Sequence, residues 1–275
     1  MDTDIHVEKK ILITGGTSGL GLELVKYFLS EGYNVYATGR DPKSARYSNE
    51  RFHFIEVDFS DLSRVSEEIH HLNELAVYFD IIINNAGILS PPVYTKTQNG
   101  FEYTFQVNFL SHLLLDEIIL SNSKKTMLPL IVSVTSPVYS LIGKIPVINF
   151  NRSEYKAFKS YAFSKFSLVL MGMHLAEKYK EDHIRCFSFN PGTFSSGIYR
   201  MQNSWFRNLY RFASPFMRSP SKVAMTLAEI MQQKKIINGA VYRSKNSFKI
   251  MDYIDKEEIE NFMTKCYDKI ESYIK

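Results

Sequence analysis

Short apolar runs alternate along this chain with longer segments whose apolar residues recur every three or four positions. The pattern of apolar and β-branched residues predicts strands at Ile11–Thr14, Asn34–Thr38, Phe52–Val57, Ile81–Asn84, Leu130–Val134, Ile184–Asn190 and Gly239–Tyr242. Segments with helical periodicity lie between most of these runs, which indicates a β-α-β series. The run Ile81-Ile82-Ile83 is apolar at every position, as expected for a parallel strand that helices cover on both faces. We therefore predict an α/β fold built on a single doubly wound parallel sheet, a Rossmann fold.

The last helical segment predicts one buried stripe, because its apolar residues are spaced by three and four positions. These residues are Ile259, Phe262, Met263, Cys266 and Ile270. The chain has no internal repeat and no linker rich in Pro or Gly. Its 275 residues lie within the range of one α/β unit. We predict a single domain over residues 1–275.

Composition excludes several classes of protein. The net charge is only +4, and no long run of Lys and Arg indicates a nucleic-acid partner. The cysteines Cys186 and Cys266 are far apart and show no metal-ligand spacing with the histidines, so we expect a reduced, cytoplasmic protein without a metal site. The polar N-terminus does not resemble a signal peptide, and no apolar stretch approaches the roughly 20 residues of a membrane-spanning helix.

The stretch Thr-Gly-Gly-Thr-Ser-Gly-Leu-Gly, residues 14–21, connects the first strand to the first helix. A glycine-rich turn there lets backbone N–H groups approach a phosphate at the positive end of the helix. The spacing of Gly15, Gly19 and Gly21 has one residue more than the common dinucleotide fingerprint. Because glycines also serve ordinary turns, this motif alone leaves a structural role open.

Polar residues follow several predicted strands at their carboxyl ends, where doubly wound sheets bind ligands. They are Arg40, Asp58, Asn84 and Ser136, and Gly15 lies at the same end of the sheet after the first strand. A second candidate pair, Tyr161 and Lys165, is four positions apart in a helical segment, so both side chains project from one face. An ammonium near a phenol lowers the phenol pKa from about 10 and makes the tyrosine a usable general acid or base. The same spacing also occurs on ordinary helices, where an aromatic ring packs beneath a lysine.

Taken together, these motifs resemble the short-chain dehydrogenase/reductase family over nearly the whole chain. They appear in the family's order as TGGTSGLG (14–21), NNAG (84–87), Asn108 in VNFLSH, Ser136 in IVSVTS, YAFSK (161–165) and NPGT (190–193). The resemblance implies that Tyr161 exchanges a proton with the substrate oxygen and that Ser136 hydrogen-bonds the same oxygen. It implies that Lys165 lowers the Tyr161 pKa and holds the nicotinamide ribose, and that Asn108 positions a water on a proton path. Ser133 is the rival to Ser136 but lies within its strand, and Pro137 departs from the family's pattern beside Ser136.

The resemblance also implies a set of cofactor-binding residues. In the glycine turn these are Gly15, Thr17, Ser18, Gly19, Leu20 and Gly21; after the third strand, Asp58 and Phe59; and elsewhere Arg40, Tyr161, Lys165, Pro191, Gly192 and Thr193. The NNAG turn, Asn84, Asn85, Ala86 and Gly87, is expected to line the adenosine side. Asp58 is expected on the adenine amino group; its alternative role is a helix cap, for which Ser60 or Asp61 is better placed.

The choice of cofactor depends on the end of the second strand. A carboxylate there would bind a ribose 2′-hydroxyl and repel a 2′-phosphate. Gly39 occupies that position and Arg40 follows it, and a guanidinium suits a phosphate. We predict NADP(H), read by Arg40 with help from Lys43. The alternative is that Arg40 is a solvated loop residue.

The later part of the chain resembles the retinol dehydrogenase-like branch of the family, on the aromatic-rich stretch 205–224 and the long interval between Ser136 and Tyr161. We expect a substrate lid at about 194–220. Aromatic residues and arginines alternate there, so an apolar lid, contact of 200–218 with a membrane surface, and contact with an acidic carrier remain open beside simple core packing.

The sequence therefore predicts an NADP(H)-dependent oxidoreductase that interconverts a carbonyl and an alcohol on a lipophilic or aromatic substrate. Two alternatives remain: a C=C reductase on the same scaffold, and a dinucleotide-binding sensor without turnover. By resemblance we also expect a homodimer, with a tetramer as the alternative, in which the helix near Phe101 and the helix of Tyr161 pair. The second helix carries an apolar surface of Phe166, Leu168, Val169, Leu170, Met171 and Met173.

Overall fold

The computed structural model describes residues 9–44, 47–123, 128–145, 152–194 and 217–275. One eight-stranded sheet runs through them in the order β3-β2-β1-β4-β5-β6-β7-β8. The strands are β1 (Lys10–Ile13), β2 (Asn34–Gly39), β3 (Phe52–Glu56), β4 (Ile81–Asn84), β5 (Leu130–Val134), β6 (Arg185–Phe189), β7 (Val241–Ser244) and β8 (Ser247–Lys249). All neighbouring strands are parallel except β7 and β8.

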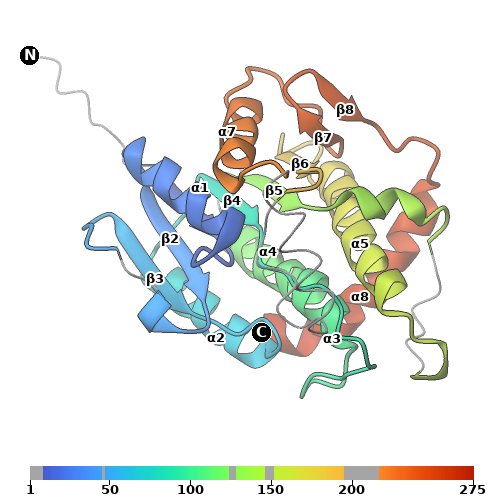
Figure 1. Cartoon of the computed structure of the whole chain (residues 1–275). Helices are drawn as coiled ribbons and strands as arrows, with labels where there is room; N and C mark the ends of the chain where they lie inside the picture. Colours follow the sequence, from blue (N-terminus) through green and yellow to red (C-terminus); the bar gives the residue numbers. More distant parts are fainter. Residues whose placement is uncertain (1–8, 45–46, 124–127, 146–151, 195–216) are drawn as a thin grey trace, which may run out of the picture.

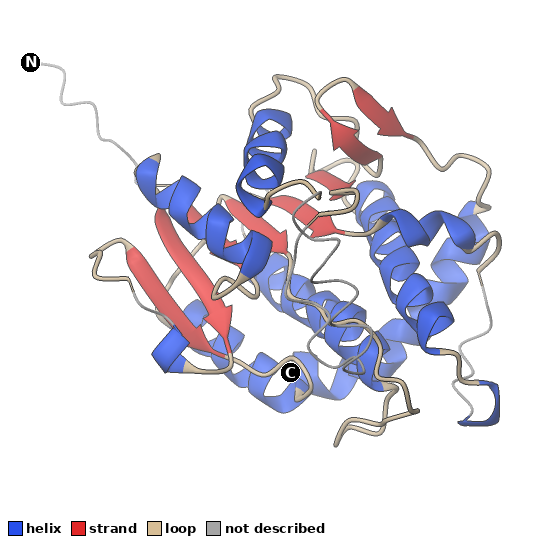
Figure 2. Ribbon diagram, in the orientation of Figure 1, coloured by secondary structure: helices blue, strands red, loops and turns tan. Residues whose placement is uncertain are grey.

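Helices connect the strands and form layers on the two faces of the sheet (Figures 1 and 2). The α-helices are α1 (Gly19–Ser30), α2 (Leu62–Glu74), α3 (Tyr103–Phe105), α4 (Ser111–Asn122), α5 (Ala157–Lys178), α7 (Pro220–Met231) and α8 (Lys256–Ile274). The shorter helical segments are η1 (Pro42–Ser44), the π-helical η2 (Gln106–Leu110), η4 (Pro137–Leu141) and η5 (Arg152–Glu154). This arrangement confirms the doubly wound α/β fold.

Two apolar cores lie on opposite faces of the sheet, because successive side chains of a strand point to opposite sides. Ile11 and Ile13 of β1 pack with α1 and α7, whereas Leu12 packs with α2, α4 and α5. α8 forms a further layer against α2, α4 and α5 (Figure 1). Burial on both faces is the physical reason that these strands are apolar at consecutive positions.

The seven predicted strands are all present, with ends that differ from the prediction by at most two residues. The eighth, β8, was not predicted; it is three residues long, exposed throughout and antiparallel at the edge of the sheet. The stripe predicted for the last helix is confirmed, since Ile259, Phe262, Met263, Cys266 and Ile270 are the buried residues of α8.

The apolar surface predicted for α5 lies inside this chain. Five of its six residues, Phe166, Leu168, Val169, Leu170 and Met171, are at most 1% exposed. They belong to the same core as the buried stripe of α8, which packs against α5. A dimer through these side chains would require α8 to move aside, and the homodimer stays a prediction.

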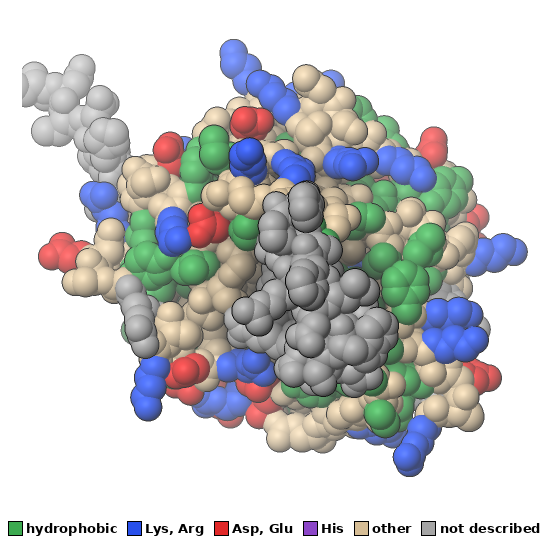
Figure 3. Space-filling model, in the orientation of Figure 1, with side chains coloured by type: hydrophobic (Ala, Val, Ile, Leu, Met, Phe, Trp, Pro, Cys, Tyr) green, Lys and Arg blue, Asp and Glu red, His purple; other side chains and the backbone are tan. Residues whose placement is uncertain are grey.

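Most of the predicted lid, residues 195–216, lies outside the described residues, as does most of the predicted membrane or carrier contact at 200–218. The two ends of the lid segment meet, because Phe194 and Arg218 form an isolated parallel bridge. Within the described part of the chain, no helix is long and apolar enough to cross a membrane, and no cluster of three His, Cys, Asp or Glu could hold a metal ion. On the face in Figure 3, Lys and Arg side chains are spread around the rim with Asp and Glu among them.

Candidate active site

The candidate site lies at the carboxyl ends of the parallel strands, around the central strands β1 and β4. These strands are neighbours, and the chain leaves them in opposite directions: β2 lies beyond β1, and β5 lies beyond β4. Parallel α/β sheets bind their ligands outside such a switch point. The glycine turn follows β1 and the NNAG turn follows β4, so the fold brings both predicted motifs to this point.

The glycine turn has a shape that requires glycine at several positions, of which Gly15 and Gly21 are examples. Gly15 has φ +67°, which side chains rarely adopt. At Gly21, an added Cβ would lie 2.2 Å from the backbone oxygen of Gly15 and 2.6 Å from Nδ2 of Asn85. The chain thus folds back on itself at the start of α1.

The N-terminus of α1 is open. Ser18 occupies the N-cap position, but its side chain makes no capping hydrogen bond, and the first turn holds no acidic residue. By contrast, Asp61, Ser219 and Asp255 cap α2, α7 and α8 with their own side chains. Unsatisfied N–H groups and the positive end of the helix dipole form a site for an anion such as a phosphate.

The NNAG turn is tied to the glycine turn by Asn85. Its Nδ2 donates to the backbone oxygen of Thr14 at 2.8 Å, and its backbone N–H donates to the Thr14 hydroxyl at 2.8 Å. At Gly87, an added Cβ would lie 3.2 Å from Oδ1 of Asn108 and 3.3 Å from Nζ of Lys165. Gly87 therefore packs closely against two of the predicted catalytic residues, Asn108 and Lys165.

Asn84 differs from the prediction that it lines the adenosine side. Its side chain is fully buried and donates to a carboxylate oxygen of Asp116 on α4 at 2.7 Å. The side chains of Leu20 and Phe59 also lie in the core, so only the main-chain atoms of these two residues are available to a ligand.

Tyr161 and Lys165 lie one turn apart on α5 and are 8% and 3% exposed. The Lys165 ammonium donates to the backbone oxygen of Val134 at 2.9 Å, and Thr135 Oγ1 donates to the backbone oxygen of Lys165 at 2.8 Å. These bonds fix Lys165 to the end of β5, two residues before Ser136. Burial lowers the Lys165 pKa from about 10.5 to about 8. The lysine is therefore poised near neutral pH rather than permanently charged.

Ser136 follows β5 and is partly exposed, whereas Ser133 lies within the strand and is 1% exposed. Pro137 occupies the first position of η4. A proline is tolerated there because the N–H that it lacks would have no hydrogen-bond partner within the helix. The Ser136 backbone is extended, and its side chain makes no capping bond to η4. The proline thus defines the turn while the hydroxyl stays available, which separates Ser136 from its rival.

Asn108 is fully buried in the π-helical segment η2. Its Oδ1 accepts from the Ile88 N–H at 2.8 Å, and its Nδ2 donates to the Ile88 oxygen at 3.0 Å and to Ser164 Oγ at 2.9 Å. Ser164 Oγ in turn donates to the backbone oxygen of Tyr161 at 2.8 Å. Asn108 therefore joins the NNAG segment to the helix of the Tyr161–Lys165 pair. π-Helical turns of this kind are frequent at functional sites.

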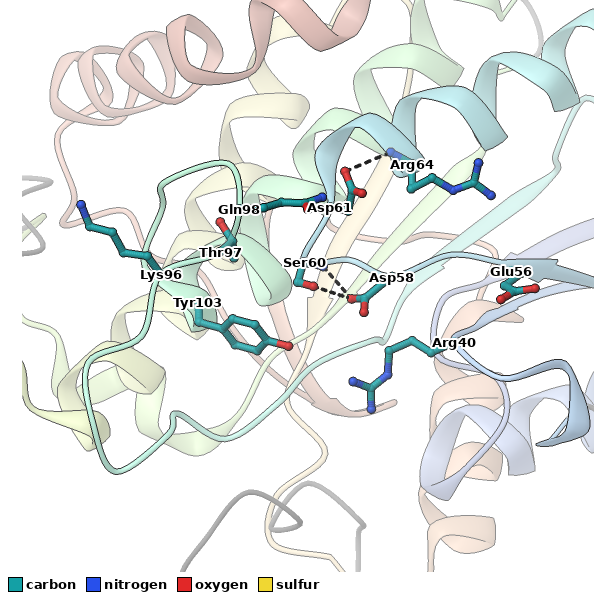
Figure 4. A pocket seen from close by; sticks show the side chains of 10 residues that line it. All are labelled: Arg40, Glu56, Asp58, Ser60, Asp61, Arg64, Lys96, Thr97, Gln98 and Tyr103. Atoms are coloured by element: carbon teal, nitrogen blue, oxygen red, sulfur yellow. Dashed lines mark hydrogen bonds between the residues drawn. The ribbon is translucent and has the colours of Figure 1, made fainter.

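Arg40 and Asp58 line one pocket of about 490 Å³ at the ends of β2 and β3 (Figure 4). Asp58 accepts from the N–H and the hydroxyl of Ser60, at 2.9 and 2.8 Å. The capping role weighed for Asp58 belongs instead to Asp61, which accepts from the first N–H groups of α2. The complete lining is Arg40, Glu56, Asp58, Ser60, Asp61, Arg64, Lys96, Thr97, Gln98 and Tyr103.

The NPGT segment follows β6. Gly192 has φ +71°, and its N–H donates to Oδ1 of Asn190 at 3.0 Å. A guanidinium nitrogen of Arg218 lies 3.4 Å from the Pro191 oxygen, and Thr193 is exposed. This places the segment at the end of β6, beside the base of the predicted lid.

Sequence reasoning missed several residues of the site. Lys96 and Tyr103 come to the pocket from the stretch 88–106, between the NNAG turn and Asn108, which carries no motif. Thr14 and His112 are joined by a hydrogen bond across 98 positions. The available signal for His112 was its spacing, since it follows Asn108 by one helical turn.

The comparisons with known proteins agree with this geometry. A family model described as short chain dehydrogenase matches residues 9–206. Human retinol dehydrogenase 11 is 29% identical over 228 residues, which cover 79% of this chain and 71% of that protein. Mouse retinol dehydrogenase 12 is 30% identical over 236 residues, which cover 82% of this chain and 73% of that protein.

Two solved structures share the fold at low identity. A 4-hydroxyisoleucine dehydrogenase complexed with NADH has a TM-score of 0.70 at 19% identity and covers 87% of this chain and 98% of its own. The RhlG/NADP complex of Pseudomonas aeruginosa has a TM-score of 0.63 at 19% identity and covers 86% and 95%. The chain belongs to the short-chain dehydrogenase family of oxidoreductases. Within that family it falls in the retinol dehydrogenase-like branch.

Proposed function

We propose that this chain is an NADP(H)-dependent oxidoreductase that interconverts a carbonyl and an alcohol on a lipophilic or aromatic substrate. The observation that carries the proposal is the buried Tyr161–Lys165 pair, whose lysine bonds to the oxygen of Val134 at the end of β5, two residues before Ser136. The names of the two relatives support an apolar alcohol or carbonyl, because retinol is such a molecule.

Each polar group has a role in moving one proton. In the reducing direction Tyr161 donates its phenolic proton to the substrate oxygen, and Ser136 donates a hydrogen bond to the same oxygen as negative charge develops there. Lys165, in its charged form, favours the phenolate that Tyr161 leaves behind. Asn108 holds the α5 backbone through Ser164, which keeps the pair in place. In the oxidising direction the proton moves back to Tyr161.

A nicotinamide dinucleotide fits the residues that the fold leaves unsatisfied. The uncapped N-terminus of α1, with the close approach of Gly21 to Gly15, suits the pyrophosphate. Lys165 would hold the nicotinamide ribose, and the NPGT segment would lie beside the ring. When bound, such a cofactor supplies or accepts a hydride.

Arg40 supports the phosphorylated form of the cofactor. Its side chain is exposed at the end of β2, and within the described residues it forms no ion pair or hydrogen bond. Arg64 lines the same pocket but is already paired with Glu67 and Glu68, at 2.8 and 2.7 Å. Arg40 is therefore the arginine of this pocket that a 2′-phosphate would engage.

The first test is a fluorescence titration of the protein with NADPH and with NADH. We expect Arg40→Ala to weaken NADPH binding by roughly tenfold to a hundredfold, since a charge-assisted hydrogen bond is lost, and to leave NADH binding nearly unchanged. Arg64→Ala is the matched control and should change neither affinity by more than about twofold. An Arg40→Ala variant with unaltered NADPH affinity would contradict the choice of NADP(H).

The second part of the test measures NADPH consumption with lipophilic aldehydes and ketones. Tyr161→Phe should lower turnover by a factor of about 100 or more, because the proton donor is lost, while NADPH still binds. Turnover of enones alone would favour the C=C reductase. Dinucleotide binding without turnover of either class would favour the sensor.

A further inference from the structure

His112 lies at the centre of a hydrogen-bonded chain that joins two halves of the site. One half is the pair of turns after β1 and β4, and the other is Asn108 with the Tyr161–Lys165 helix. It is fully buried on α4, one turn after Asn108. Its Nδ1 is 3.0 Å from the backbone oxygen of Asn108, and its Nε2 is 2.9 Å from the Thr14 hydroxyl. A backbone oxygen can only accept, so Nδ1 carries the proton. Nε2 of the neutral ring is then an acceptor, and the Thr14 hydroxyl donates to it.

The ring stays neutral, which keeps this direction of the hydrogen bonds. Burial, together with the nearby Lys165, lowers the pKa of His112 to about 3. A neutral imidazole has one donor and one acceptor, and here both are used. His112 therefore does not titrate in the range in which proteins normally work.

The contact with Thr14 orders the turn after β4. A hydroxyl has one proton and two lone pairs. Because the proton goes to His112, both lone pairs are free to accept, and they receive the N–H groups of Asn85 and Ala86, each at 2.8 Å. The backbone oxygen of Ile83, at 3.3 Å, is a longer alternative for the same proton. His112 thus sets the orientation in which Thr14 holds the NNAG turn.

The contact with Asn108 orders the other half. In the π-helical segment the Ser111 N–H bonds to the oxygen of Gln106, five residues back, so the regular helical ladder is interrupted. His112 supplies a side-chain donor to the Asn108 oxygen within this irregular turn. From there the chain of bonds continues through the Asn108 side chain to Ser164 and the backbone of Tyr161.

We propose that His112 is a positioning residue that holds the cofactor-binding turns and the proton-transfer residues in one relative position. Its Nε2 acts on the turns through Thr14, and its Nδ1 acts on Asn108. The inference rests on the proposed function for the meaning of these two halves. If the proposal is right, loss of the Thr14 contact should affect cofactor binding, and loss of the Asn108 contact should affect turnover.

Two variants separate the contacts. The side-chain amide of Asn reaches the position of Nδ1, so His112→Asn keeps the hydrogen bond to the Asn108 oxygen and loses the one from the Thr14 hydroxyl. The side-chain amide of Gln reaches the position of Nε2, so His112→Gln keeps the hydrogen bond from the Thr14 hydroxyl and loses the one to the Asn108 oxygen. His112→Phe keeps the ring volume and loses both. His174→Gln is the matched control, because His174 is a second buried histidine, bonded to Glu260 on α8 at 2.9 Å.

The expected result is a split between binding and turnover. His112→Asn should weaken NADPH binding about fivefold with kcat within about twofold, and His112→Gln should do the opposite, each reflecting one lost hydrogen bond. His112→Phe should show both losses, and His174→Gln neither. Equal losses in the Asn and Gln variants, in proportion to their melting temperatures, or no losses at all, would overturn the proposal.

A measurement without any ligand distinguishes this inference from the proposed function. Hydrogen exchange of the Asn85 and Ala86 amides should be faster in His112→Asn and unchanged in His112→Gln, and nitrogen NMR should report a neutral ring protonated at Nδ1 from pH 5 to 9. Protonation at Nε2, or titration in that range, refutes the assignment of His112. If wild-type protein binds no dinucleotide while exchange behaves as expected, the proposed function fails and the coupling through His112 stands.

Discussion

Asn84 and Asp116 meet in the interior between β4 and α4, and both are at most 1% exposed. Nδ2 of Asn84 donates to one carboxylate oxygen of Asp116, while Oδ1 of Asn84 and Oδ1 of Asp116 have no hydrogen-bond partner among the described residues. Burial raises the pKa of Asp116 to about 8. The fold therefore keeps this carboxyl protonated at neutral pH, since an ionised one would be buried without a cation.

This pair predicts a pH-dependent stability. The unfolded chain releases the Asp116 proton near pH 4, whereas the folded chain keeps it up to about pH 8. The contribution of protonated Asp116 to the free energy of unfolding is fully present below pH 4 and is lost as the pH rises to 8. Asp116→Asn removes this loss, so its gain in free energy of unfolding should be near zero at pH 4 and several kcal/mol at pH 8. Urea unfolding at pH 4.5, 6 and 8 measures it.

The control for this prediction is Glu117→Gln, the neighbouring carboxylate, which is paired with Lys178 at 2.9 Å nearer the surface. Its effect should be small and should not grow with pH in the same way. A gain from Asp116→Asn that is the same at all three pH values would show that Asp116 is ionised in the folded protein.

At the scale of the element, the turn between β1 and α1 depends on the approach of two backbones. A methyl group at Gly21 would lie 2.2 Å from the Gly15 oxygen. That oxygen belongs to the backbone, so it cannot move aside as the end of a flexible side chain could. Gly15 itself packs against Ala86 of the NNAG turn. The turn is thus held between the helix on one side and a neighbouring strand end on the other.

Gly21→Ala should therefore weaken dinucleotide binding by more than tenfold and destabilise the protein by roughly 1–3 kcal/mol, the usual cost of overpacking. Alanine is otherwise the better helix former by about 1 kcal/mol, so a destabilisation isolates the clash. Gly143→Ala is the control, because no atom lies within 4 Å of its added Cβ. NADPH titration and thermal unfolding of both variants test this, and tight binding by Gly21→Ala would contradict the predicted site.

At the scale of the molecule, α8 closes one side of the fold. Phe262 of α8 lies 5.9 Å, ring centre to ring centre, from both Phe109 and Phe163 and is 4% exposed. It thereby links α8 to the π-helical segment and to α5. The apolar face of α5 is an internal surface of this chain, and the last helix supplies part of its cover.

Phe262→Ala should cost about 3 kcal/mol of stability, the usual effect of removing a buried aromatic ring. NADPH affinity should stay within about twofold, because α8 covers the face opposite α1. Urea unfolding and NADPH titration measure the two effects, and sedimentation measures whether the uncovered face now associates. A loss of NADPH binding larger than the fraction unfolded would show that α8 shapes the cofactor site directly.

The sequence by itself determined the strands of the parallel sheet, the order of the motifs that follow them and the candidate residues of the site, because these depend on local patterns. An apolar run bounded by turn residues, a glycine turn before a helix, and a Tyr and Lys one turn apart are each legible within about ten residues. Tertiary structure decided what these patterns touch. It turned Asn84 into the core, brought Lys96 and Tyr103 to the pocket, and added β8 at the edge.

The same division explains why the contacts of His112 and the packing partner of α8 were not anticipated. His112 reads as an ordinary helical residue until the sheet brings Thr14, 98 positions away, against its ring. The apolar stripe of α8 was legible, but the face of α5 that it covers was not, since a stripe does not specify its partner. Contacts between distant segments depend on the whole packed arrangement, and that arrangement exists only in the folded chain.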